Sequence, residues 1–197
     1  MTNKQVFDFT SISNIAIDRR WRQQQYPMAS VLALVTQQSI KSDDAKYLLI
    51  QRQKEPYKGK WALVGGKLEF GETIKDAVVR ETAEETGLQT NFVGLKAVIN
   101  ERVAPSNKQE TAGHFLLFVC ELSYLDGHAT EKQEGPVGWF TLDELHQLQK
   151  RRQIISTDYT VLNHAINFGT TIPFVEAGFR ASSHESEADI SQYNEFT

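Results

Sequence analysis

The sequence predicts one mixed domain of the α/β (α+β) class, in which a β-sheet packs against a few helices. Its 197 residues suit a single domain, and a hydrophobic content of 40% is enough for a proper core. Several short apolar runs bounded by polar turns have the length of strands. They surround one central segment, residues 73–86, with helical apolar spacing. Strands that outnumber helices and surround a central one favour a sandwich of sheet and helix layers.

The first strands follow a polar extension, which we expect over residues 1–26. The strands expected next are Met28–Val35, Tyr47–Arg52 and Trp61–Val64. A polar turn separates the first two, so they can pair as a hairpin. The third stops at Gly65 and Gly66, two adjacent glycines that suit a turn with unusual backbone angles.

A central helix is expected over residues 73–86, because Thr73 can cap its N-terminus and Gly87 can end it. The strands expected after this helix are Phe92–Asn100, His114–Leu122 and Val137–Phe140. Residues 101–113, between the first two of these strands, are polar and are expected to form a loop.

Two further helices are expected toward the C-terminus. Thr141 begins the first with a Thr-x-x-Glu capping box, and the second covers residues 158–168. We therefore expect a domain over residues 27–150 and a C-terminal helical extension over residues 151–180. Residues 181–197 contain four acidic residues and no Lys or Arg, which favours a disordered acidic tail.

The amino-acid composition limits which binding partners and which cellular compartment are expected. With 21 Lys and Arg against 25 Asp and Glu, the chain is too acidic for a broad nucleic-acid-binding surface, so no stable nucleic-acid binding is expected. No apolar stretch approaches the roughly 18 residues of a spanning helix, so no membrane partner is expected. The single cysteine, Cys120, excludes an internal disulfide and a zinc site of several thiolates, which favours a cytoplasmic location.

The predicted inward face of the central helix combines apolar and acidic side chains. At about 100° per residue, Ile74, Ala77 and Val78 define an apolar stripe. Three carboxylates continue this stripe: Glu81, Glu84 and Glu85. Like charges at this spacing repel, and pointing them inward requires that they be paired or neutralised. A solvated acidic helix end is one explanation, and a bound divalent cation is the other, since clustered carboxylate oxygens suit hard ions.

Residues that flank the helix complete a known pattern. Glu72 and Arg80 bracket its first two turns and can pair, which would pin the preceding loop to the helix. One pattern in this segment resembles the Nudix box: Gly66, five residues, Glu72, seven residues and then Arg80-Glu81-Thr82-Ala83-Glu84-Glu85-Thr86-Gly87-Leu88. The pattern is far more specific than a lone glycine-rich loop.

The resemblance covers residues 66–88, and the strands around them extend it to about residues 27–150. It implies a Nudix-type α/β/α sandwich, with a mixed β-sheet and a central catalytic loop and helix. Two positions depart from the family: Thr82 stands where an aliphatic residue is usual, and Val64 where a proline is common. Neither departure removes a charge, so metal binding is still expected.

The resemblance also implies a metal site that binds Mg²⁺ or Mn²⁺. Its ligands would be Glu81, Glu84 and Glu85, with the carbonyl oxygen of Gly65 nearby. Glu72 would orient Arg80, which in turn would hold the glutamates.

Further residues are expected to act on the substrate. Glu134 lies in a later loop that resembles the corresponding loop of MutT-type members, although an ordinary charged loop is an equally open interpretation. The general base is either Glu81 or Glu134. The candidates for substrate contact are Arg52, Trp61 and Gly66.

The implied activity is hydrolysis of the pyrophosphate link in a nucleoside diphosphate joined to another group. The candidate substrates are a nucleoside triphosphate such as oxidised dGTP, which suits a MutT-like layout, and ADP-ribose, for which Pro105 is a hint. The alternative is a Nudix-fold nucleotide sensor or regulator with weak catalysis, against which the intact box argues. A small nucleotide is the expected partner, and a homodimer is left open.

Overall fold

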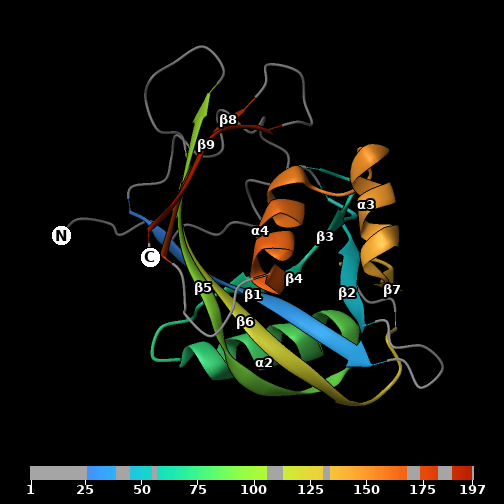
Figure 1. Ribbon diagram of the computed structural model, residues 1–197. Helices are drawn as coiled ribbons and strands as arrows, with labels where there is room; N and C mark the ends of the chain where they lie inside the picture. Colours follow the sequence, from blue (N-terminus) through green and yellow to red (C-terminus); the bar gives the residue numbers. More distant parts are fainter. Residues whose placement is uncertain are drawn as a thin grey trace.

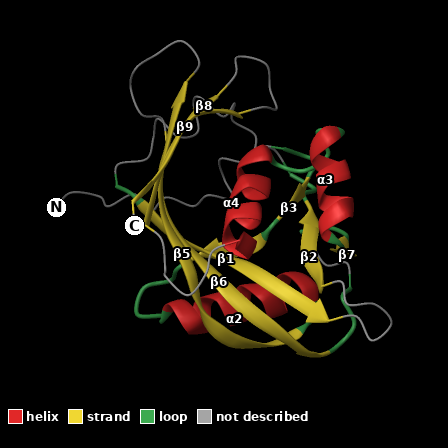
Figure 2. Cartoon of the chain, in the orientation of Figure 1, coloured by secondary structure: helices red, strands yellow, loops and turns green. Residues whose placement is uncertain are grey.

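The computed structural model describes residues 26–38, 45–54, 57–105, 113–130, 134–167, 174–181 and 188–196. A mixed β-sheet lies between two helical layers: α2 covers one face, and α3 and α4 lie on the other (Figure 1). Figure 2 shows the same layers with the strands in yellow. The expected α/β/α sandwich is confirmed. The N-terminal extension expected over residues 1–26 lies almost entirely outside the described residues.

The strands are β1 (Met28–Gln38), β2 (Ala45–Gln51), β3 (Trp61–Ala62), β4 (Val64–Lys67), β5 (Gln89–Pro105), β6 (Gly113–Asp126), β7 (Val137–Phe140), β8 (Phe174–Ala181) and β9 (Ala188–Phe196). The helices are α2 (Ile74–Thr86), α3 (Leu142–Lys150) and α4 (Ser156–Asn167). None of the helices in the described residues is long and apolar enough to cross a membrane.

The described strands form one sheet in the order β3-β2-β1-β6-β5-β8-β9, with β4 paired to β1 and β7 paired to β2. Strands β1 and β2 form the expected antiparallel pair. The β1–β6 and β5–β8 pairs are parallel, which makes the sheet mixed. The β1–β4 pairing sets Gly65 opposite Leu32 and Gly66 opposite Val31, so the two glycines lie beside a central strand.

Strand β1 contributes to two apolar cores, because successive residues of a strand point to opposite faces. On one face Val31 and Val35 pack in a core with Ala77 and Val78 of α2. On the other face Leu34 packs in a core with α4 residues that include Leu162 and Ala165. Burying each Val or Leu side chain contributes about 1.5–3 kcal/mol, so apolar contact with the sheet holds both helical layers in place.

Helix α2 begins and ends as the sequence predicts. The Thr73 hydroxyl accepts a 3.1 Å hydrogen bond from the Asp76 amide, and Gly87 ends the helix in the left-handed region with φ of 76°. Thr82 is fully buried, and its hydroxyl donates to the Val78 carbonyl over 2.7 Å. The departure from an aliphatic residue is therefore accommodated by a hydrogen bond within the helix.

Two segments, one in β5 and one between β3 and β4, differ from the sequence prediction. Residues 101–105 continue this strand instead of opening a loop, because they pair with β6 on one side and with β8 on the other. The strand expected over 61–64 is split into β3 and β4 at Leu63, whose amide donates to Asp158 Oδ2 over 2.9 Å instead of to a neighbouring strand.

The C-terminal region also differs from the prediction. The structure describes residues 188–196 as β9, paired antiparallel with β8, so the expectation of a disordered tail over 181–197 does not hold for them. Pairing with β8 gives this polar segment backbone partners that its composition does not reveal. Residues 182–187 and 197 lie outside the described residues. Helix α4 starts at Ser156 and packs into the same core as the sheet, so the C-terminal extension is not separate from the domain.

Candidate active site

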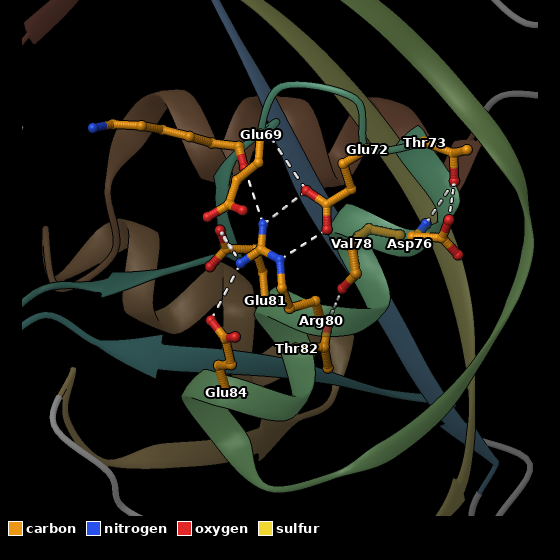
Figure 3. A network of polar contacts seen from close by, with 10 residues as sticks. Glu69, Glu72, Thr73, Asp76, Val78, Arg80, Glu81, Thr82 and Glu84 are labelled. Carbon is orange, nitrogen blue, oxygen red and sulfur yellow. Dashed lines mark hydrogen bonds and ion pairs between the residues drawn. The ribbon is translucent and has the colours of Figure 1, made fainter. Parts of the chain in front are cut away.

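Arg80 lies at the centre of an acidic cluster at the middle of α2 (Figure 3). Its Nε and Nη2 atoms contact the two carboxylate oxygens of Glu72 at 2.8 and 3.0 Å. Its Nη1 atom lies 2.9 Å from Glu81 Oε1 and 3.2 Å from Glu84 Oε2. Nη2 also donates to the Lys67 carbonyl over 3.3 Å. One guanidinium therefore contacts three carboxylates and the strand before the helix.

The Glu72–Arg80 pair confirms the expectation that these residues pin the loop to the helix. The hydrogen bonds from Arg80 lower the pKa of Glu72 below its ordinary value, and those from Glu72 raise the pKa of Arg80. Glu72 also accepts a 3.2 Å hydrogen bond from the Glu69 amide within the loop. The two-point contact fixes both the distance and the orientation of the loop on α2.

Glu81 lies against the backbone of Gly66. A Cβ built on Gly66 would overlap the Glu81 carboxylate, so only glycine leaves room for that group. Burial raises the pKa of Glu81, the contact with Arg80 opposes this, and the charges of Glu84 and Glu72 raise it further. The sequence predicted Gly66 as a substrate contact, and the structure shows that it also makes space for Glu81.

Glu85 lies one turn further along α2 and faces Gly65. Its Oε2 accepts a 3.3 Å hydrogen bond from the Gly65 amide. Burial raises the pKa of Glu85 to about 8, the Gly65 hydrogen bond lowers it, and the charges of Glu81 and Glu134 raise it again. Glu81 and Glu85 are half-buried, as the predicted inward-facing stripe requires, but the prediction is wrong for Glu84, whose side chain is exposed and bonds Arg80 at the surface of α2.

Glu134 lies within electrostatic reach of Glu85, because its charge raises the pKa of Glu85. Its Oε1 lies 2.9 Å from Lys54 Nζ, and both side chains are about half exposed. The loop that carries it is fixed to the end of β2: the Gln51 amide donates to the Pro136 carbonyl over 2.7 Å. Gly135, with φ of 131°, packs so closely on Gln51 that a Cβ would overlap the Gln51 carbonyl oxygen.

The two other candidates for substrate contact, Arg52 and Trp61, lie in different surroundings. The charge of Arg52 lowers the pKa of Glu85, so the Arg52 guanidinium lies within electrostatic reach of Glu85. Trp61 packs edge-on against Phe140, with ring centroids 4.7 Å apart, and is half-buried. Its backbone pairs with Gln153 and Ile155 just before α4.

Sequence reasoning did not single out two acidic residues near this site, Glu101 and Asp158. Asp158 was expected only as the first residue of a helix, and Glu101 as the first residue of a loop. A signal existed for Glu101, because it alternates with Ile99 and Val103 on one face of β5.

The donor set suits a hard divalent cation, although the side chains are not arranged around one. Within the described residues, no three acidic, His or Cys side chains are grouped as a metal site would require. Glu81 and Glu84 both turn toward Arg80 instead. Buried carboxylates beside a glycine backbone are nevertheless the ligands that Mg²⁺ and Mn²⁺ prefer, and a cation would remove the cost of keeping Glu81 and Glu85 ionised.

The family model of the NUDIX domain matches residues 27–159, which is more than half of the chain. The chain therefore belongs to the Nudix hydrolase family. Hydrolases of this family generally depend on a divalent cation.

Relatives and structures agree with this placement. An ADP-ribose pyrophosphatase from Methanocaldococcus jannaschii is 36% identical over 117 residues, covering 59% of this chain and 66% of that protein. A Mycobacterium tuberculosis protein, named as a candidate 8-oxo-dGTP diphosphatase, is 30% identical over 102 residues, covering 51% of this chain and 68% of that protein. The match thus spans about two thirds of each relative's length. A MutT protein from Bacillus halodurans has the same fold, with a TM-score of 0.66 and 21% identity over 85% of this chain and 97% of that one.

Proposed function

We propose that the chain hydrolyses the pyrophosphate bond of a nucleoside diphosphate joined to another group, with Mg²⁺ or Mn²⁺ as cofactor. The observation that supports this most is the inward-facing set of Glu81 and Glu85 beside Gly65 and Gly66, in which Arg80 holds Glu81 and the Gly65 amide holds Glu85. ADP-ribose is the first candidate substrate, because a relative aligned over the Nudix segment carries that name. A nucleoside triphosphate such as oxidised dGTP is the second, supported by the name of the mycobacterial relative.

The metal would be held by carboxylates of α2. Glu81, Glu84 and Glu85 are its proposed ligands, together with the carbonyl oxygen of Gly65. A bound divalent cation neutralises phosphate charge and lowers the pKa of a bound water. Arg80 keeps Glu81 and Glu84 close to one another despite their like charge, and Glu72 keeps Arg80 in place.

Other residues are proposed to bind and activate the reactants. Arg52 would contact a phosphate, since its charge already reaches the site. Trp61 and Gly66 would contact the rest of the substrate. The proton of the attacking water would pass to Glu81 or to Glu134, which Lys54 holds at the rim of the site.

A release assay tests the proposal. AMP and ribose 5-phosphate are measured from ADP-ribose, and the nucleoside monophosphate and pyrophosphate from dGTP and oxidised dGTP, with Mg²⁺, with Mn²⁺ and with excess chelator. We expect turnover that stops with chelator and falls by at least about 10²-fold in Glu81→Gln and Glu85→Gln, because the cation loses an anionic ligand. Glu121→Gln is the matched control, because Glu121 pairs with Lys96 at 3.2 Å elsewhere on the sheet. Full turnover with chelator, or near-normal turnover in both site variants, would contradict the proposal.

Calorimetry beside the release assay separates the enzyme from the alternative, a nucleotide sensor. A sensor would bind ADP-ribose in calorimetry yet release no product with either cation. A cytoplasmic location and a homodimer, both raised from the sequence, stay predictions.

A further inference from the structure

We propose that Lys54 binds the pyrophosphate of the substrate, and that Glu134 holds Lys54 at the edge of the site before the substrate binds. The inference rests on the proposed hydrolase function and adds a phosphate-binding residue beside Arg52. It comes from an ion pair in which Lys54 Nζ lies 2.9 Å from Glu134 Oε1.

Backbone contacts bring the two charged side chains together. Gly135, which follows Glu134, packs against the chain just before Lys54. A Cβ on this glycine would overlap the Gln51 carbonyl oxygen and lie 2.9 Å from Gln53 Cγ. The neighbours of Lys54 and of Glu134 are therefore in contact, so the ion pair is built into the packing of two segments.

One flank of Glu134 is fixed to the helix that carries the proposed metal ligands. The Thr130 amide donates to the Thr86 carbonyl over 3.0 Å, and the Thr130 hydroxyl donates to the same oxygen over 3.5 Å. Thr86 follows Glu85 and is the last residue of α2. The chain before Glu134 is thus attached next to Glu85.

The residues that precede Lys54 lead to the glycine pair on the opposite side of the site. Gln51 pairs with Trp61 of β3. Gly65, whose amide donates to Glu85, follows four residues after Trp61. The ion pair therefore lies between α2 and the β3–β4 segment, which together supply the proposed ligands of the cation.

The pair is exposed enough to exchange partners. The side chains of Lys54 and Glu134 are 51% and 45% exposed. An ion pair this open to solvent shifts an equilibrium by about fivefold at most, so a ligand with more charge can displace Glu134. A pyrophosphate link carries a negative charge on each phosphate, and a lysine ammonium offers three donors on a flexible stem. Lys54 thus moves to the phosphates once substrate is bound, and Glu134 is left free to accept a proton from water.

A double-mutant cycle measured by calorimetry tests the inference. The ligand is the methylene-bridged analogue of ADP-ribose, which cannot be cleaved between its phosphates, titrated with Mg²⁺ into each variant. We expect Lys54→Met to weaken binding by about tenfold or more, because a charge-assisted contact is lost, and Lys54→Arg to keep most of the affinity. Glu134→Gln should tighten binding by up to about fivefold, because Lys54 no longer has to leave a carboxylate. In the Lys54→Met background, Glu134→Gln should change nothing.

The chain offers a matched control pair. Lys96 of β5 and Glu121 of β6 lie 3.2 Å apart, and neither Lys96→Met nor Glu121→Gln should change the affinity for the analogue. Because Lys54 and Glu134 are each about half exposed, their variants should fold, and the melting temperature checks this.

Three results would overturn the inference. They are no binding of the analogue by the wild type, unchanged affinity in Lys54→Met, or equal tightening by Glu134→Gln with and without Lys54. The last result would mean that Glu134 acts on the phosphates by repulsion alone. The proposed function fails on a separate ground, namely absence of product release with cation. A protein that shows the expected cycle but releases no product would refute the hydrolase and leave the phosphate contact standing.

Discussion

Replacing Gly66 with alanine would place a methyl group where the Glu81 carboxylate now lies. The new Cβ would be 2.5 Å from Glu81 Oε2 and nearer still to Cδ and Oε1. Ordinary van der Waals contact begins at about 3.4 Å, so the carboxylate must move by about 1 Å. The backbone at Gly66 lies outside the left-handed region, so alanine brings no strain of its own there.

This displacement should affect turnover much more than stability. A misplacement of about 1 Å at a reacting group costs about 10²-fold in rate, which corresponds to about 2.7 kcal/mol in the activation barrier. Since the carboxylate is the free end of a flexible side chain, it can swing aside, and the free energy of unfolding should change by less than about 1 kcal/mol.

The assay is turnover of ADP-ribose with Mg²⁺, together with the melting temperature of each variant. Gly94→Ala is the matched control, since a Cβ there meets nothing within 4 Å. Gly71→Ala is a second control, because its φ of +83° makes alanine strained without any clash. The reasoning is refuted if Gly66→Ala turns over as fast as Gly94→Ala, or if its loss of turnover is explained by unfolding.

Three further predictions concern stability. Glu72→Gln should lower both the melting temperature and turnover, because it weakens the two-point contact with Arg80, whereas Asp143→Asn on the exposed start of α3 should leave turnover unchanged. Because the folded-state pKa of Glu101 is raised to about 8 from an ordinary 4.5, the native state binds the extra proton, and this contribution to stability is lost as pH rises from about 5 to 8. In urea unfolding across that pH range, the free energy of unfolding should decline less in Glu101→Gln than in the wild type. Equal declines would contradict this expectation. Deleting residues 182–197 should lower the melting temperature, because β8 loses its β9 partner; an unchanged value would restore the expectation of an undocked tail.

Most of the site on α2 could be predicted from the sequence, because its signals are local. The spacing of Glu81, Glu84 and Glu85 places them together on any helix. Thr73 and Gly87 fix where that helix begins and ends. The Glu72–Arg80 pair follows from a short loop followed by two helical turns.

The residues that sequence reasoning missed depend on contacts between distant segments. The break between β3 and β4 requires Asp158, which lies 95 residues after Leu63 in the chain. Glu101 resembled the start of a polar loop because its two strand partners, Phe115 and Ala177, come later in the chain. Composition likewise described the C-terminal segment as a tail, since a polar strand is recognisable only beside the strand that pairs with it.

The two edges of the Arg80 guanidinium serve different partners. The Nε and Nη2 edge contacts Glu72 of the loop, while Nη1 alone contacts Glu81 and Glu84 of the helix. If the Glu81 side chain turns toward another charge, the Nη1 contact changes and the loop contact stays intact. Lysine keeps the charge but has a single nitrogen without a planar fork. At any one time a lysine ammonium could bind either Glu72 of the loop or the helix residues Glu81 and Glu84. In Arg80→Lys, the loop and the helix would therefore compete for one ammonium group.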